Sequence, residues 1–264
     1  MKTHTHTTVF DRVVCGVDGS DAGVRAARVA GVVTDPEGTL TLVAANDTSI
    51  AVHAGWKMAQ VLDELALDAH GALERGRTEA EPLHPLEAKL VEGDPLRCLL
   101  AEIARREATV VVVGSHGISR ATGIALGAVS TYLLHEAPCS VLIARGSVDV
   151  EPWPQRIVVG VDGSDDSARA VEAAAALVER FDADLRAVVA THDARVDLDA
   201  ARRIAPDCEV HDGQALDILE AASESADLIV LGSRGLRGVR ALGSLSERIA
   251  HEASCSVLVV RSPE

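Results

Sequence analysis

Residues 12–21 read Arg-Val-Val-Cys-Gly-Val-Asp-Gly-Ser-Asp, and residues 156–165 read Arg-Ile-Val-Val-Gly-Val-Asp-Gly-Ser-Asp. Each stretch is a branched aliphatic run that ends in Gly-Val-Asp-Gly-Ser, which is typical of a buried strand followed by a turn. Two further blocks recur in the same order, with residues 111–117 returning at 229–235 and residues 135–142 returning at 251–258. Three blocks repeated in one order indicate two copies of one structural unit.

The repeat divides the chain of 264 residues into two expected domains, residues 8–146 and residues 155–262, joined by a linker with Pro, Gly and acidic residues. The second copy is shorter, because the separation between matching blocks falls from 144 (positions 18 and 162) to 118 (positions 114 and 232). In the second copy, only residues 194–204 stand where the first copy has its extra length. That extra length carries apolar residues at spacings of three and four, which predict a long amphipathic helix: Val52, Trp56, Ala59, Leu62, Leu65, Ala69 and Leu73.

Strand and helix signals alternate along both copies. Branched runs predict strands at residues 13–18, 40–45, 87–91, 109–114, 140–144, 157–162, 185–190, 208–211, 228–232 and 256–260. Helices are predicted at about residues 22–33, 95–106, 166–180 and 214–225, with Asp21, Asp94 and Asp165 as N-caps. This alternation implies an α/β fold with two tandem, doubly wound, parallel five-stranded sheets and helices on both faces, Rossmann-like and of the adenine-nucleotide-binding type.

The composition argues against several function classes. A formal net charge of −15 repels the phosphate backbone, so nucleic acid is not expected as a partner. No apolar run reaches the roughly 18–20 residues that span a bilayer, so a cytoplasmic protein without a membrane partner is expected. The five cysteines are dispersed and form no Cys-x-x-Cys pair, which argues against a zinc site and against a disulfide framework.

Three motifs point to one edge of each sheet, since ligands of such folds bind beyond the carboxyl ends of the strands. Asp18 and Asp162 stand at the carboxyl end of the first predicted strand of each copy, where each could meet a polar ligand or a metal ion, or only cap a turn or a helix. A Gly-x-x-Gly turn follows the fourth strand, and its glycines let backbone N–H groups approach an anion. The next helix opens at a glycine, and helix N-termini bind phosphate. These two motifs comprise Gly114, His116, Gly117, Gly127, Val129 and Ser130 in the first copy and Gly232, Arg234, Gly235, Gly243, Ser244, Leu245 and Ser246 in the second.

Together these motifs resemble the universal stress protein family, and the resemblance covers both copies almost end to end. ATP-binding members of that family carry Gly-x2-Gly-x9-Gly-(Ser/Thr) at this place. The resemblance implies a stress-response regulatory protein that binds ATP, with or without Mg²⁺, at the glycine loop after the fourth strand. It also implies that Ala44 and Val189, which align near the end of the second strand of each copy, lie near the adenine base.

Both copies depart from the ATP-binding pattern. Ala128 stands where the first copy should carry Ser or Thr, although Ser130 remains. The second copy has seven residues between Gly235 and Gly243 where the pattern asks for nine. A second hypothesis is therefore a nucleotide-free protein–protein interaction module of the same fold, with an unknown protein partner. Which copy binds nucleotide is left open.

No constellation for fast catalysis is present, so the chain is not expected to be an enzyme, and slow ATP hydrolysis of the kind some family members show stays open. No Gly-x4-Gly-Lys-(Ser/Thr) motif occurs, which excludes P-loop chemistry. An adenylating enzyme on a similar fold would need a Ser-Gly-Gly-type loop that Gly-Val-Asp-Gly-Ser does not supply. The resemblance further implies that the last strands, residues 140–144 and 256–260, pair the two halves within one chain, and it leaves a homodimer of two such chains open.

Overall fold

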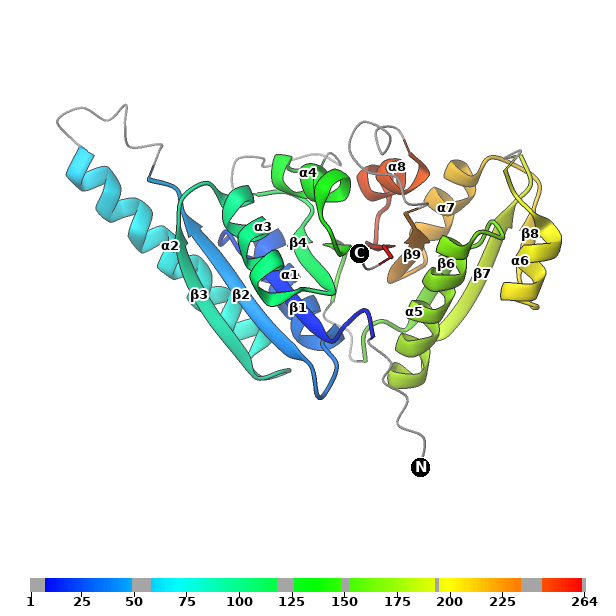
Figure 1. The fold of residues 1–264 in the computed structure, drawn as a ribbon, viewed down its shortest axis with the longest axis horizontal. Coiled ribbons are helices and arrows are strands. Elements are labelled where there is room, and N and C mark those ends of the chain that lie inside the picture. The colour runs from blue at the N-terminus through cyan, green and yellow to red at the C-terminus, as the bar shows by residue number, and fades with distance from the viewer. Residues whose placement is uncertain are drawn as a thin grey trace.

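The computed structural model describes residues 8–48, 58–117, 126–148, 152–192, 195–233 and 244–262. These residues form a ten-stranded sheet with helices on both faces (Figure 1). The strands are ordered β3-β2-β1-β4-β5-β10-β9-β6-β7-β8 across the sheet, so all ten predicted strands are confirmed. Their bounds are β1 Arg12–Gly16, β2 Thr39–Asn46, β3 Leu86–Glu92, β4 Val110–Gly114, β5 Ser140–Ala144, β6 Arg156–Gly160, β7 Asp184–Ala190, β8 Glu209–His211, β9 Leu228–Gly232 and β10 Ser256–Val260.

The sheet consists of two parallel five-stranded halves joined at one antiparallel seam. Strands β1–β5 pair in parallel within the first half, and β6–β10 do so within the second. At the seam β5 runs antiparallel to β10, with Leu142 opposite Leu258. The predicted pairing of the last strands within one chain is thus confirmed. Because an aliphatic edge strand exposes unpaired N–H and C=O groups, the seam removes two such edges at once.

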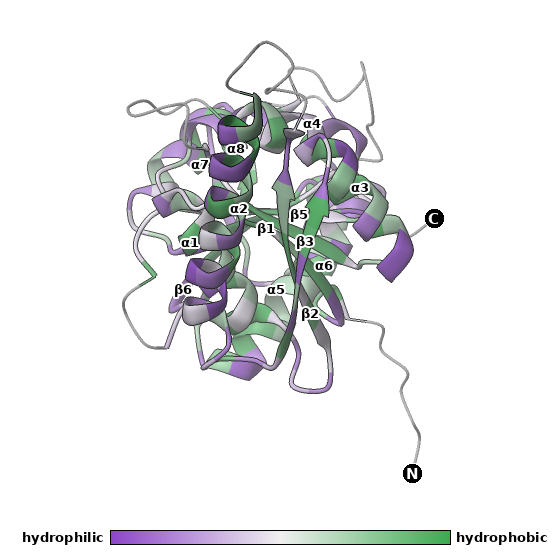
Figure 2. Cartoon of the chain, turned by 90° about the vertical axis from the view of Figure 1, so that its left-hand side faces the viewer, coloured by the Kyte–Doolittle hydropathy of each residue, from purple (hydrophilic) through white to green (hydrophobic). Residues whose placement is uncertain are grey.

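Helices cover both faces of the sheet, as predicted. Alternate residues of each strand point to opposite faces, so Val13 and Cys15 belong to one apolar core while Val14 belongs to the other. In Figure 2 the strands are mostly green, and the outer turns of the helices carry purple residues. The first core is covered by α1 (Asp21–Val33), α2 (Met58–Ala80), α5 (Asp165–Phe181) and α6 (Leu198–Ile204), and the second by α3 (Pro95–Arg106), α4 (Ala128–Glu136), α7 (Ala215–Ser223) and α8 (Leu245–Glu252).

Two of the three predicted N-caps are wrong. Ser20 caps α1 by accepting a hydrogen bond from the Gly23 N–H at 3.1 Å, and Asp21 is the first helical residue. Ser164 caps α5 in the same way, so Asp165 is also displaced by one position. Ser20 and Ser164 adopt the extended backbone that an N-cap requires. The third prediction is confirmed, since Asp94 caps α3 and Pro95 follows it.

The predicted long helix is confirmed as α2 from residue 58 onward, whereas Val52 and Trp56 lie outside the described residues. Its predicted apolar stripe is only partly right. The N-terminal half of α2 projects beyond the sheet (Figure 1), so Ala59 is exposed and Leu62 and Leu65 are only half-buried. The buried face lies further along, at Ala69, Ala72, Leu73, Gly76 and Ala80. In the second half, the corresponding helix α6 has only seven residues.

A reciprocal pair of arginines ties the two halves together at the seam. Arg145 follows β5 and donates to the carbonyl oxygens of His251, at 3.1 Å, and Ala253, where α8 ends. Arg261 follows β10 and donates to the carbonyl oxygens of Leu134 and Ala137, where α4 ends. Each cation therefore meets the negative end of the last helix of the opposite half.

His251, on α8, provides a pH-dependent contact across the same seam. Its Nδ1 accepts a hydrogen bond from the Leu126 N–H at 3.5 Å, so the fold uses the ring with Nδ1 unprotonated. Burial lowers the pKa of His251, and Arg145 and His135 lower it further, while Glu247 acts in the opposite direction.

We expect His251 to stabilise the fold at neutral pH and to lose this contribution in acid. A histidine whose pKa is lower in the folded than in the unfolded state favours folding above its ordinary value of about 6.5. As the pH falls from 7.5 to 5, His251→Gln should therefore lose less free energy of unfolding than the wild type, measured by urea denaturation. Parallel pH profiles for the two proteins would contradict this role.

Candidate functional site

The turn after β1 holds Asp18 in one orientation. Asp18 Oδ1 accepts hydrogen bonds from the Ser20 N–H at 3.0 Å and from the Ser20 hydroxyl at 2.5 Å. Asp162 makes the same two contacts with Ser164 in the second half, at the same two distances. The turn-capping role is therefore present in both halves. It leaves Asp18 Oδ2 facing the loop that follows β4, because a Cβ built on Gly117 would lie 2.6 Å from it.

Glycine is required where β4 and β9 end. A Cβ on Gly114 would lie 2.6 Å from the carbonyl carbon of Ala22, at the start of α1. A Cβ on Gly232 would lie 2.5 Å from the carbonyl carbon of Asp166, at the start of α5. These are backbone atoms that cannot move aside. The first glycine of each predicted Gly-x-x-Gly turn therefore lets the strand end pack against a helix N-terminus.

The glycine loop and the start of α4 form one compact unit in the first half. The Gly127 N–H donates to the Ser115 carbonyl oxygen at 2.8 Å, and the Ser130 hydroxyl donates to the Gly114 carbonyl oxygen at 2.7 Å. A Cβ on Gly127 would lie 3.4 Å from the His116 Cα. The structure thus brings together the predicted residues Asp18, Gly114, His116, Gly117, Gly127, Val129 and Ser130.

Neither the N-cap nor the first turn of helix α4 compensates for the positive end of the helix. Its N-cap is Gly127, which has no side-chain hydrogen bond to offer, and its first turn carries no acidic residue. The first N–H groups of a helix have no partner within the helix, and they carry a partial positive charge that attracts anions. The start of α4 is therefore suited to phosphate, with the amides of Ala128, Val129 and Ser130 as the donors.

Helix α8, at the equivalent place in the second half, is different. Ser244 caps it by accepting from the Glu247 N–H at 3.3 Å, and the Ser246 hydroxyl lies 3.3 Å from that of Ser244. Leu245 is the first helical residue, and Glu247 places a carboxylate in the first turn. Both features reduce the attraction of this helix start for an anion. Arg234, Gly235 and Gly243 lie outside the described residues.

Ala44 and Val189 are placed differently from the other predicted site residues. Their side chains are 1% and 0% exposed, and both belong to the core beneath α1 and α5. The neighbouring carbonyl oxygens already have partners, because Val43 accepts from the Val17 N–H and Val188 accepts from the Val161 N–H, both at 2.9 Å. Because the side chains of Ala44 and Val189 are buried, only the backbone of either residue could contact a base.

Arg75, on α2, is a cation at this site that the motifs did not reveal. A Cβ built on Gly19 would overlap Arg75 Nη2, so the guanidinium lies against the turn that follows Asp18. Arg75 is exposed. The available sequence signal is Gly71, four residues earlier and thus on the same helix face. Nothing in the sequence shows that this face meets Gly19.

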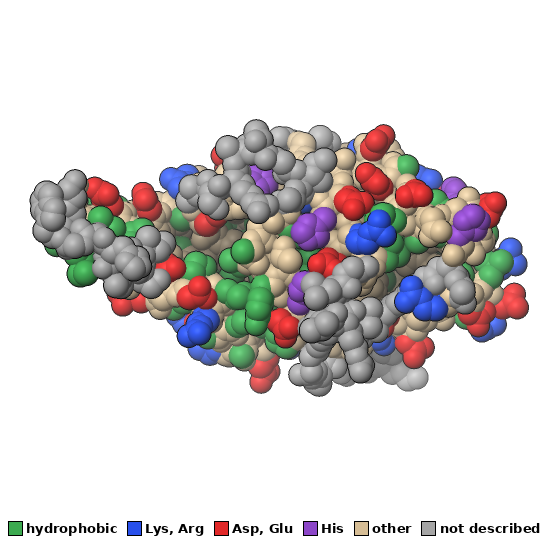
Figure 3. Space-filling model, turned by 90° about the horizontal axis from the view of Figure 1, so that it is seen from above, with side chains coloured by type: hydrophobic (Ala, Val, Ile, Leu, Met, Phe, Trp, Pro, Cys, Tyr) green, Lys and Arg blue, Asp and Glu red, His purple; other side chains and the backbone are tan. Residues whose placement is uncertain are grey.

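The two candidate helix starts are linked across the seam. His135, in the last turn of α4, has its Nε2 2.9 Å from Glu247 Oε1, in the first turn of α8. Figure 3 views the molecule from above and shows histidine and acidic side chains gathered near the middle of this face. Glu247 is thus held by a residue of the other half, at the start of α8.

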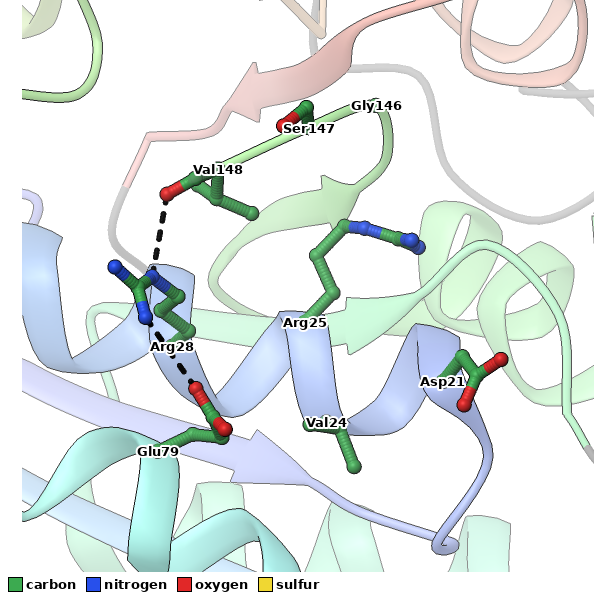
Figure 4. A pocket seen from close by; sticks show the side chains of 8 residues that line it. All are labelled: Asp21, Val24, Arg25, Arg28, Glu79, Gly146, Ser147 and Val148. Carbon is green, nitrogen blue, oxygen red and sulfur yellow. Dashed lines mark hydrogen bonds and ion pairs between the residues drawn. The ribbon is translucent and has the colours of Figure 1, made fainter. Parts of the chain in front are cut away.

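A cavity of about 370 Å³ lies beside α1 (Figure 4). Arg28 borders it, donating to the Val148 carbonyl oxygen at 3.2 Å and pairing with Glu79 at 3.4 Å. Figure 4 shows the Arg25 side chain projecting across the space between α1 and Gly146. The cavity belongs to the junction of α1, α2 and the segment after β5, and none of the predicted site residues lines it.

The comparisons with known proteins agree with this architecture. The model of the universal stress protein family matches residues 10–145, 154–207 and 194–261. The chain belongs to the universal stress protein family. A universal stress protein of Mycolicibacterium smegmatis is 30% identical, in an alignment that covers 94% of this chain and 96% of that protein.

Two further relatives place the chain within the family. Universal stress protein Rv2623 of Mycobacterium tuberculosis is 33% identical, in an alignment that covers 59% of this chain and 62% of that protein's length. The crystal structure of a universal stress protein from Archaeoglobus fulgidus superposes with a TM-score of 0.72 at 22% identity, covering 97% of this chain and 98% of that chain. The latter likeness shows a shared Rossmann-like fold.

The described residues also limit what else the chain presents. Among them, no group of three or more His, Cys, Asp or Glu side chains is arranged to hold a metal ion. None of the helices in that part of the chain combines the length and apolar character that a membrane span needs.

Proposed function

We propose that this universal stress protein binds an adenine nucleotide, ATP with or without Mg²⁺, at the carboxyl-end edge of its first half, and acts as a stress-response regulator without fast catalysis. The observation that carries the proposal is the start of α4, which has neither a side-chain cap nor an acidic residue and lies directly against the glycine loop. The phosphates would accept hydrogen bonds from the backbone amides of Ala128, Val129 and Ser130 at the start of α4. Asp18 would accept hydrogen bonds from the sugar or the base.

The first half is favoured over the second by the charges at the two helix starts. At α8 the Ser244 hydroxyl already accepts from a first-turn N–H, and Glu247 adds a negative charge. Carboxylates near a helix N-terminus satisfy the positive end that a phosphate would otherwise use. We therefore propose one nucleotide per chain rather than two.

Ser130 supports the site without supplying a hydrogen atom to phosphate. Its hydroxyl donates to the Gly114 carbonyl oxygen, and Ala128 has no hydroxyl, so the binding energy would come from backbone amides. A missing hydrogen bond to a charged group is worth about 1.5–3 kcal/mol, which corresponds to about ten- to a hundredfold in affinity. We propose a correspondingly weaker nucleotide site than one with both hydroxyls.

We further propose that the two domains are residues 8–146 and 155–262, and that the second half supports the first through the seam. The chain works in the cytoplasm, with which its five free cysteines are compatible. Any homodimer or protein partner would respond to nucleotide in the first half.

A direct test is to denature the freshly purified protein and chromatograph the released nucleotide against the protein concentration. The proposal predicts adenine nucleotide at up to one molecule per chain, and binding of added ATP to chains that lost it during purification. No released nucleotide, followed by no heat of binding at millimolar Mg-ATP, would contradict the proposal and favour the nucleotide-free interaction module.

A further inference from the structure

Arg75 is seated on backbone rather than paired with an acid. Its side chain runs back along α2 toward the N-terminus, as long helical side chains do. Nη1 would be 3.6 Å from a Cβ on Gly71, which is ordinary van der Waals contact, whereas Nη2 would clash with a Cβ on Gly19. The glycine at position 19 therefore lets the planar guanidinium lie close to the turn. Within the described residues, Arg75 has no hydrogen-bonding or ion-pair partner.

The turn on which Arg75 lies has a left-handed backbone. Gly19 has a φ of +79°, a conformation that L side chains rarely adopt. The next residue back is Asp18, whose carboxylate faces the glycine loop at Gly117. Arg75 and the glycine loop therefore lie on either side of one turn, with Asp18 between them.

The order of the strands decides which end of a bound nucleotide Arg75 would meet. Across the sheet the order is β2-β1-β4, and α2 packs over the β2 side, while the glycine loop and α4 follow β4. With the phosphates at the start of α4, the base would lie toward β1 and β2, about 5–10 Å away on the usual strand spacing. That is the side on which Arg75 lies.

In the second half, the described residues around Gly163 include no counterpart to this cation. Gly163 matches Gly19 and has a φ of +87°, but the space beside it is filled by the Asp197 carbonyl oxygen and the Ala200 Cβ of the α6 region. A Cβ on Gly163 would lie 2.5 Å and 2.9 Å from these atoms. The shortening of the second copy thus replaces a guanidinium with a backbone oxygen and a methyl group.

We propose that Arg75 is a nucleotide-contacting residue of the first half, with its guanidinium lying over the face of the base. This inference rests on the proposed nucleotide site. An unpaired planar cation against the turn at Gly19 matches the face of a purine, through stacking and cation–π attraction. The contact would also favour binding in the first half over the second, as the proposed function requires.

The test is titration of adenosine and of ATP into the full chain, for the wild type and for Arg75→Ala. If Arg75 meets the base, the variant binds both ligands more weakly by one common factor, about three- to thirtyfold. Arg77→Ala is the matched control, because Arg77 is two residues away on α2 and pairs with Glu81 at 2.9 Å. It should leave both affinities unchanged.

The opposite outcomes separate this inference from the proposed function. A loss of affinity for ATP but not for adenosine would mean that Arg75 contacts phosphate. Unchanged affinities for both ligands would mean that Arg75 only offsets the negative charge of the nearby Asp18. If the wild type binds nucleotide, either result overturns the proposed contact between Arg75 and the base and leaves the proposed function intact. No binding of either ligand by the wild type overturns the proposed function and this inference with it.

Discussion

Replacing Gly117 with valine is expected to weaken ATP binding by at least about a hundredfold. The Cβ of the new side chain would lie 2.6 Å from Asp18 Oδ2, so the carboxylate or the loop would have to shift, and the added methyl groups would take up space within the proposed site. Phosphate would then lose its approach to the backbone amides of Ala128, Val129 and Ser130 beside the loop. Each lost hydrogen bond to a charged group is worth about 1.5–3 kcal/mol, so two such losses exceed a hundredfold in affinity.

Calorimetric titration of ATP into Gly117→Val and into the wild type measures this effect. Gly235 corresponds to Gly117 in the sequence repeat, so Gly235→Val is the matched control and should keep wild-type affinity. The fold should survive in the Gly117 variant, because the atom that must move is a side-chain oxygen of Asp18 and not a backbone atom. Wild-type affinity in Gly117→Val, with loss in Gly235→Val, would transfer the site to the second half.

Removing the Arg261 side chain is expected to lower the free energy of unfolding by about 3 kcal/mol. Arg261 is 6% exposed, and its guanidinium donates to two carbonyl oxygens at the end of α4. Hydrogen bonds to a charged donor are worth about 1.5–3 kcal/mol each, and part of that is offset because the variant no longer buries a cation. The lost contacts tie the second half to the first, so Arg261→Ala should loosen the seam.

Urea denaturation of Arg261→Ala measures this loss. Arg186→Ala is a suitable control, because Arg186 pairs with Glu209 at 2.8 Å on exposed side chains and should contribute less than about 1 kcal/mol. Equal losses in the two variants would show that the seam arginine contributes no more than a surface ion pair. In that case the β5–β10 pairing and the two cores would have to hold the halves together without it.

Most of the fold follows from the sequence, because buried parallel strands are continuous aliphatic runs and the repeat marks them twice. The errors lie at element ends, where hydrogen bonds decide. Strand β1 ends at Gly16 and not at Asp18, since Asp18 is drawn into the turn by Ser20. The same serine displaces the predicted cap of α1 by one residue.

The sequence predicts the loop and the helix starts of the candidate site, but not the charged and polar contacts that distinguish its two halves. The glycine spacing identifies the loop and the helix starts, since both depend on local backbone geometry. The contacts of Ser130 and Glu247 depend on packing between elements, and in the case of Glu247 on His135 from the other half. Arg75 reaches Gly19 only because α2 packs beside α1. No spacing within the sequence encodes such approaches.

Equilibrium dialysis of radiolabelled ATP against the nucleotide-free chain is the most direct test of a single nucleotide site in the first half. We expect one ATP per chain at saturation, lost in Gly117→Val and kept in Gly235→Val. Two ATP per chain, no ATP at millimolar concentration, or a single site that is lost only in Gly235→Val would contradict this expectation.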